Sequence, residues 1–126
     1  MIRVLLDAGA FIAFERGDVT LRARLTAARR SGVDLVTTAP IVGQVWRDGR
    51  RQALLATLIR AVDVVAPDVE AAKRAGELLA RSRTRDVVDA LLVVLARDGD
   101  TILTSDPRDM GALVAAASVR ASVVAT

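Results

Sequence analysis

Three aspartates, Asp7, Asp89 and Asp106, have the side-chain type and the placement expected of a metal-binding site. Asp89 is the only charged residue in the apolar stretch 87–96, and burying an ionised carboxylate without a partner is very costly. Asp7 and Asp106 each follow a short strand-like segment. Carboxylates that share a pocket need a cation to offset their repulsion, and Mg²⁺ and Mn²⁺ prefer oxygen ligands. We therefore expect one acidic pocket that holds a divalent ion.

Helix capping is the alternative explanation for the other acidic residues. Asp7, Asp86 and Asp106 each precede a predicted helix, where an aspartate side chain can accept a hydrogen bond from a backbone N–H. For Asp109, in the first turn of the last helix, we prefer the capping and helix-dipole role. Capping explains Asp89 less well, because its neighbours are all apolar and turn it inward. Both interpretations therefore stay open for Asp7, Asp86 and Asp106.

Composition narrows the possible chemistry. The sequence contains no His and no Cys, which excludes a Ser-His-Asp triad, a histidine zinc site and thiolate or disulfide chemistry. Polar chemistry must therefore use Asp, Glu, Arg, Ser and Thr. That inventory again favours a hard, oxygen-ligated ion such as Mg²⁺ or Mn²⁺.

The charge balance and hydropathy indicate the classes of partner. The net charge is +3, and Lys73 is the only lysine, so nearly all basic residues are arginines. Arginine binds phosphate bidentately, which fits nucleic acid, although a genome-wide preference for Arg and Ala codons explains the composition equally well. Aromatic residues make up 2%, which argues against a base-stacking platform.

No apolar stretch is long enough to span a membrane, and no basic region precedes the first strand, so we expect a cytoplasmic protein.

Strand-like apolar runs alternate along the chain with segments of helical pattern. The predicted strands are Ile2–Leu6, Asp34–Val36, Val62–Val65, Thr101–Thr104 and Val119–Val124. The predicted helices are Ala8–Glu15, Val19–Ser31, Pro40–Trp46, Arg50–Arg60, Asp68–Arg81, Asp86–Arg97 and Pro107–Ala116. This alternation predicts an α/β fold whose parallel sheet is covered by helices. Such sheets bind ligands at the carboxyl ends of their strands, where Asp7 and Asp106 fall. The 126 residues suit a single domain, 1–126.

Three segments together resemble the PIN-domain proteins, and specifically the VapC-type ribonuclease toxins of bacterial toxin–antitoxin pairs. They are Leu5–Ala13, Arg85–Ala90 and Leu103–Pro107. The order of the predicted elements also fits, so the resemblance covers the whole chain. It implies a three-layer α/β/α fold with a central parallel sheet of about five strands. It also implies Mg²⁺- or Mn²⁺-dependent endonucleolytic cleavage of RNA as the toxin of a type II toxin–antitoxin system.

The resemblance also assigns site residues by position. Asp7 and Asp89 match the first and third acidic ligands of the family, and Asp106 matches the fourth. Asp86 and Asp109 are accessory acids, and Thr104 matches a supporting hydroxyl. These matches predict that Asp7, Asp89 and Asp106 are the catalytic, metal-holding residues.

The sequence departs from the family pattern at the second acid. The segment that usually carries a glutamate has Gln44 here, which offers a neutral oxygen and no charge. A missing carboxylate should weaken binding of divalent ions, so Gln44 is expected at the margin of the site. Arginines near the pocket would bind flanking phosphates, and Arg47, Arg85 and Arg108 are the best candidates.

The expected partners follow from the family and from composition. They are an RNA substrate, a cognate antitoxin that inserts an arginine among the carboxylates, and a second copy of the chain, since 52% of the residues are hydrophobic. The main alternative is a catalytically weakened PIN domain that acts chiefly by binding RNA or antitoxin. A phosphoacceptor receiver-like domain needs a lysine at a strand end, whereas Lys73 falls in a predicted helix. A Rossmann module lacks its glycine motif, and a purely structural protein would leave Asp89 unexplained.

Overall fold

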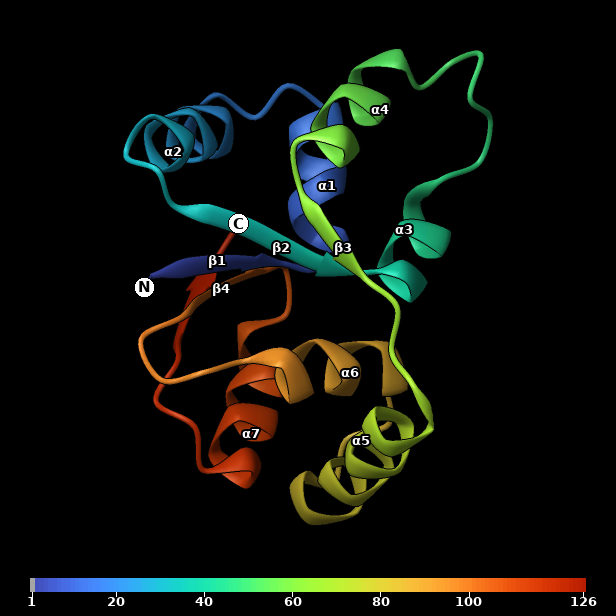
Figure 1. The fold of residues 1–126 in the computed structure, drawn as a ribbon, viewed down its shortest axis with the longest axis vertical. Coiled ribbons are helices and arrows are strands. Elements are labelled where there is room, and N and C mark those ends of the chain that lie inside the picture. The colour runs from blue at the N-terminus through green and yellow to red at the C-terminus, as the bar shows by residue number, and fades with distance from the viewer. Residues whose placement is uncertain (1) are drawn as a thin grey trace.

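A parallel five-stranded sheet forms the centre of the computed structural model, which describes residues 2–126 (Figure 1). The strands lie in the order β3-β2-β1-β4-β5, and every neighbouring pair is parallel. Their bounds are β1 Arg3–Leu6, β2 Asp34–Thr38, β3 Asp63–Val65, β4 Thr101–Thr104 and β5 Ser122–Ala125. The predicted α/β class with a central parallel sheet of about five strands is confirmed.

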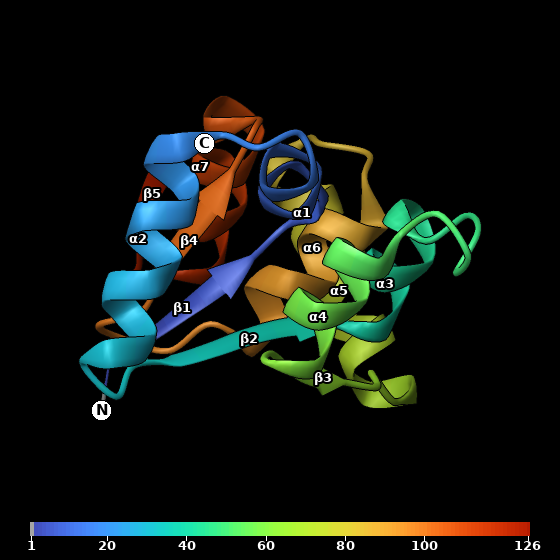
Figure 2. The same ribbon diagram turned by 90° about the horizontal axis from the view of Figure 1, so that it is seen from above.

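Helices cover both faces of the sheet, which makes three layers (Figures 1 and 2). Helices α1, α2 and α4 lie on one face, α5, α6 and α7 pack against each other on the other, and α3 follows β2 beside α1. Their bounds are α1 Ala8–Glu15, α2 Val19–Arg30, α3 Ala39–Val45, α4 Ala53–Arg60, α5 Val69–Ser82, α6 Val87–Leu95 and α7 Pro107–Ala117. Within residues 2–126, none of these helices has the length and apolar character needed to cross a bilayer.

The core lies on both faces of the two central strands. Leu5 and Leu6 of β1 are fully buried, as is Ile102 of β4. Successive side chains of a strand point to opposite faces, so β1 contributes to the packing of both helical layers. This two-sided burial explains why the strands are continuous apolar runs rather than alternating ones. It also fixes the carboxyl ends of β1 and β4 next to each other.

Several predicted boundaries differ from the structure, most by one or two residues, such as β2, which extends to Thr38 rather than Val36; three differences have a visible cause. Residues 50–52 are not helical: the Gln52 side chain binds the backbone of the preceding turn, accepting from the amides of Arg47 and Asp48 at 2.7 and 2.9 Å. Helix α6 stops at Leu95, before a turn that ends in Asp100. The last strand begins at residue 122 rather than 119. In each case side-chain or turn hydrogen bonds, which periodicity does not reveal, end or replace the regular element.

A buried ion pair lies at the amino-terminal edge of the sheet. Arg3 of β1 donates through Nε and Nη2 to the two carboxylate oxygens of Asp100, at 3.2 and 2.7 Å. The Asp100 side chain is 1% exposed and that of Arg3 13% exposed. Arg3 also donates to the carbonyl of Leu95, and Asp100 accepts from the amide of Arg97. This network ties the first strand to the end of α6, at the opposite edge of the sheet from Asp7.

Candidate active site

An acidic pocket of about 450 Å³ lies at the carboxyl edge of the sheet. Its polar lining consists of Asp7, Gln44, Arg47, Asp86, Asp89, Ser105 and Asp106. The structure thus brings together the three aspartates predicted as metal ligands, along with Gln44 and the accessory acid Asp86. Asp109 does not line the pocket but lies close enough to influence Asp89.

The strand order explains why residues so distant in sequence meet. The chain leaves β1 for β2 on one side, whereas β4 pairs with β1 on the other. Ligand sites of parallel sheets form where connections diverge in this way, outside the carboxyl ends of the strands. Asp7 directly follows β1, and Asp106 follows β4 by two residues. Asp89 reaches the same edge because α6 begins there, at Val87.

Three of the acids also cap helices, so the capping interpretation is confirmed for them. Asp7 accepts from the amide of Ala10 at 3.1 Å. Asp86 accepts from the amide of Asp89 at 3.1 Å, and Asp106 from that of Asp109 at 3.3 Å. Each of these bonds uses Oδ1. The other carboxylate oxygen remains for the pocket, so capping and ligand roles are compatible in one side chain.

Asp89 is the acid whose ionisation is most strongly affected. Burial first, and then repulsion from the charges of Asp86, Asp7, Asp106 and Asp109, raises the pKa of Asp89 to about 7. The interpretation of Asp89 as an inward-facing charge among apolar neighbours therefore agrees with its environment. The pocket holds more negative charge than its own residues balance.

Asp7 and Thr104 are the buried polar residues at this edge of β1 and β4. Asp7 is 4% exposed, and burial raises its pKa, while hydrogen bonds from the Thr104 side chain and from the Ala10 amide act in the opposite direction. The Thr104 hydroxyl also accepts from the amide of Asp106 at 2.9 Å. Thr104 therefore links the turns that carry Asp7 and Asp106.

Comparison with known proteins identifies the family. A sequence profile described as the PIN domain matches residues 4–113. The chain belongs to the PIN-domain family. No curated protein matches this sequence significantly.

Two solved structures share the fold of this PIN domain at low sequence identity. One is the VapBC2 complex of Rickettsia felis bound to a promoter DNA fragment, with a TM-score of 0.68, 10% identity, and coverage of 100% of this chain and 99% of that one. The other is FitAB bound to an IR36 DNA fragment, with a TM-score of 0.66, 15% identity, and coverage of 97% and 94%. Both likenesses concern the fold.

The donor set of this PIN domain fits a divalent cation. PIN-domain nucleases generally use divalent metals. Within residues 2–126, no Arg or Lys forms an ion pair with Asp7, Asp86, Asp89 or Asp106. As the side chains of the same residues stand, no three acids are close enough together to hold one ion. The pocket therefore supplies carboxylates of the correct type and excess negative charge, but their oxygens have to converge when an ion binds.

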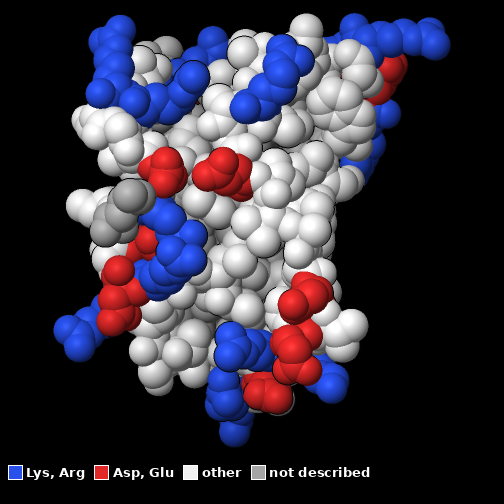
Figure 3. Space-filling model, viewed as in Figure 1, with Lys and Arg blue, Asp and Glu red and all other residues white. Residues whose placement is uncertain are grey.

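The three arginines predicted to bind RNA have different positions. Arg47 lines the acidic pocket, and its Nη1 donates to the carbonyls of Gly43 and Trp46, which leaves its other guanidinium nitrogens available. Arg85 and Arg108 are exposed and are not among the pocket's lining residues. Lys and Arg side chains are instead spread over the surface, with groups at the top of the molecule and near its lower end (Figure 3). Arginine content alone therefore does not locate an RNA path.

Gly9 allows a close contact between α1 and the turn after β4. It lies within α1, and a Cβ on it would be 2.5 Å from the Ser105 Cβ and 2.9 Å from the Ser105 backbone nitrogen. Only a residue without a side chain allows the β4–α7 turn to approach α1 this closely. Gly9 thereby permits the turn that carries Asp106 to lie against the helix that Asp7 caps.

Proposed function

We propose that this protein is a Mg²⁺- or Mn²⁺-dependent endoribonuclease and the toxin of a type II toxin–antitoxin system. The convergence of Asp7, Asp89 and Asp106 in one pocket, with no cationic side chain paired to them in the described chain, carries the proposal. Membership of a family of nucleases supports it.

Each residue has a definite task in this proposal. Asp7, Asp89 and Asp106 hold the ion, and Gln44 contributes an oxygen at its margin. A bound Mg²⁺ or Mn²⁺ supplies Lewis acidity, which makes a water more acidic and offsets charge developing on the phosphate. Thr104 fixes Asp7 relative to Asp106, and the free nitrogens of Arg47 bind a phosphate of the RNA.

The partners are also part of the proposal. The two structures of similar fold are toxin–antitoxin complexes bound to DNA, which supports a small DNA-binding antitoxin as the partner of this chain. An arginine of that antitoxin would enter the acidic pocket and neutralise it in place of the metal. We further expect the protein to act in the cytoplasm, where its RNA substrate is found, and to form a homodimer.

The metal dependence of RNA cleavage tests the function. Purified protein should cleave single-stranded RNA with Mg²⁺ or Mn²⁺ and lose all cleavage in EDTA, because without the ion no group in the pocket activates the attacking water. Gel analysis of end-labelled RNA over a manganese titration measures this, and re-addition of Mn²⁺ after EDTA serves as the control. Cleavage that persists in EDTA, or its absence at every metal concentration, would contradict the proposal.

A catalytically weakened PIN domain is the second candidate, and Gln44 is the observation that favours it. Gln44 lines the pocket where the family pattern has an acid. Replacing it by glutamate adds one negative ligand, so Gln44→Glu should bind Mn²⁺ about tenfold more tightly, a gain of about 1.4 kcal/mol. Calorimetric titration with Mn²⁺ measures the affinity, and Gln44→Ala, which adds no charge, is the control.

RNA cleavage by the same variant separates the two candidates. A large gain in cleavage by Gln44→Glu would indicate that the natural protein acts mainly by binding RNA or antitoxin. Unchanged cleavage would indicate that the Gln44 amide is a competent substitute. Equal Mn²⁺ affinity for Gln44→Glu and Gln44→Ala would contradict the placement of residue 44 beside the ion.

A further inference from the structure

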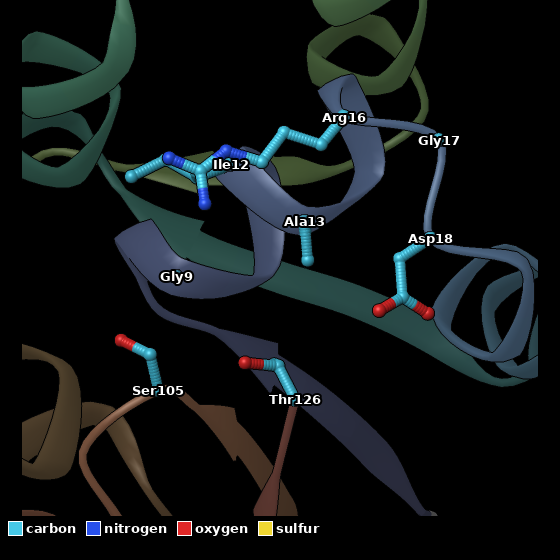
Figure 4. A pocket seen from close by; sticks show the side chains of 8 residues that line it. All are labelled: Gly9, Ile12, Ala13, Arg16, Gly17, Asp18, Ser105 and Thr126. Atoms are coloured by element: carbon cyan, nitrogen blue, oxygen red, sulfur yellow. The ribbon is translucent and has the colours of Figure 1, made fainter.

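A second cavity, of about 580 Å³, adjoins the acidic pocket at the far end of α1 (Figure 4). Gly9, Ile12 and Ser105 line both cavities. The two cavities therefore lie side by side along α1, one among the carboxylates and the other reaching Arg16, and the Gly9–Ser105 contact borders both. We call the two cavities together the groove. None of the tasks proposed above uses this second part of the groove.

One face of α1 forms a wall along the groove. Gly9, Ile12, Ala13 and Arg16 are spaced by three, four and seven residues, which places them in one stripe of a helix. The first two border both cavities, and the last two border only the second. Ala13 adds only a small side chain to the second cavity, whereas Gly9 packs directly against Ser105. On the opposite side, Ser105 and Thr126 each contribute a hydroxyl-bearing side chain (Figure 4).

Among the described residues, Arg16 is the one basic side chain in the lining of this second cavity. Arg16 is exposed and forms no ion pair within residues 2–126, and its side chain extends back along α1 in the direction of Ile12 (Figure 4). The lining also holds one acid, Asp18, which caps α2 and accepts from the Leu21 amide at 2.8 Å. The groove thus has one cation in the acidic pocket, Arg47, and a second, Arg16, beyond it.

We infer that the second cavity binds the nucleotide next to the scissile phosphodiester, with Arg16 holding its phosphate. This inference rests on the proposed nuclease function, because it places the cleaved bond in the acidic pocket. A single RNA strand crossing that pocket can continue into the adjoining cavity, where a guanidinium can bind phosphate and the two hydroxyls can bind phosphate or ribose oxygens. Ile12, whose side chain is 38% exposed, offers an apolar contact to the ribose or base.

Binding of RNA without cleavage tests the role of Arg16. The probe is a short, fluorescently labelled, single-stranded oligoribonucleotide of mixed sequence, and anisotropy in EDTA gives its Kd. Arg16→Ala should bind about tenfold more weakly, the loss expected for one charge-assisted hydrogen bond. The slope of log Kd against log salt should fall by about 0.7, the contribution of one phosphate contact to a single strand. Arg16→Lys should keep most of the salt slope, because lysine also binds phosphate as a point charge.

Arg30→Ala is the matched control. Arg30 is exposed at the end of α2 and lines neither cavity, so its loss makes the same change in net charge and should leave both the Kd and the salt slope nearly unchanged. Equal losses in the two variants would overturn the inference, because the effect would then be one of net charge. Unchanged binding by Arg16→Ala would also overturn it and would favour a protein segment as the occupant.

The test of the Arg16 nucleotide site can fail or succeed independently of the nuclease proposal. If Arg16→Ala weakens RNA binding selectively while the wild type cleaves no RNA with any metal, the nucleotide site stands and the nuclease proposal fails. If the wild type cleaves RNA, Arg16→Ala should raise KM with little change in kcat. A fall in kcat alone would contradict a role in binding.

Discussion

Replacing Asp89 by asparagine should abolish metal-dependent RNA cleavage while making the metal-free protein more stable. Asparagine keeps the size of the side chain and one oxygen, but it removes the charge that holds the cation. We expect a loss of at least about a thousandfold in kcat/KM, or about 4 kcal/mol of transition-state stabilisation. End-labelled RNA with Mn²⁺ measures the loss. Asp63→Asn, an exposed acid at the start of β3, is the control and should cleave normally.

The expected gain in stability has a defined pH dependence. In the folded, metal-free protein the pKa of Asp89 is raised from 3.8 to about 7, so the folded state binds a proton more tightly than the unfolded state does. Stability of the wild type therefore falls as the pH rises from about 4 to about 7 and levels off above that. Asp89→Asn lacks this loss, so its advantage should be smallest near pH 4 and greatest above pH 7.

Thermal unfolding in EDTA at several pH values measures this advantage. The Asp63→Asn control should show no such trend, because Asp63 lies outside the acidic pocket. An Asp89→Asn variant that is less stable than the wild type at pH 8 would show that Asp89 serves the fold rather than a cation site. Undiminished cleavage by the same variant would show that Asp89 is not part of the catalytic site.

Replacing Asp100 by alanine should destabilise the fold more than any change to a surface charge. Asp100 is nearly inaccessible, and its removal leaves the Arg3 guanidinium and the Arg97 amide without their acceptors. Breaking a buried ion pair by removing one partner costs about 3–5 kcal/mol. Urea denaturation measures the free energy of unfolding, with the m-value checked for two-state behaviour.

The exposed pair of Arg51 and Asp48 provides the matched control for Asp100. These side chains are 3.9 Å apart and about half or more exposed, and such pairs contribute at most about 1 kcal/mol. Asp48→Ala should therefore change stability little. A loss for Asp100→Ala that is no larger than for Asp48→Ala would show that the amino-terminal network contributes little to the fold.

Much of the fold could be predicted because the sequence carries its signals locally. The apolar run before Asp7 and the one before Thr104 indicate buried strands, and their alternation with helices indicates a parallel sheet. The convergence of Asp7 with Asp106 follows from the shared direction of such strands. Asp89 could be singled out because it interrupts an apolar face. These are the parts of the site that periodicity and composition determine.

Other features depend on tertiary contacts that the sequence does not reveal. Asp100 follows a glycine in a polar turn, and nothing nearby in sequence indicates its pairing with Arg3 across the molecule. Arg16 is one arginine among many, and only its position beside the second cavity, in line with Gly9 and Ala13 of α1, distinguishes it. Arg85 and Arg108 are close to site residues in sequence, but their side chains lie outside the pocket. Proximity in sequence was therefore a poor guide to the basic residues.

The strand order also bears on when the acidic pocket can form during synthesis of the chain. β1, β2 and β3, with the helices between them, emerge from the ribosome before the segment that carries Asp89 and Asp106. Domains generally fold as units, so the acidic pocket forms only after the segment that carries two of its three proposed ligands has emerged. A chain whose translation stops before β4 has no complete site. The same strand order leaves one edge of β1 unpaired until β4 is made, so the nascent chain is exposed to mispairing over that interval.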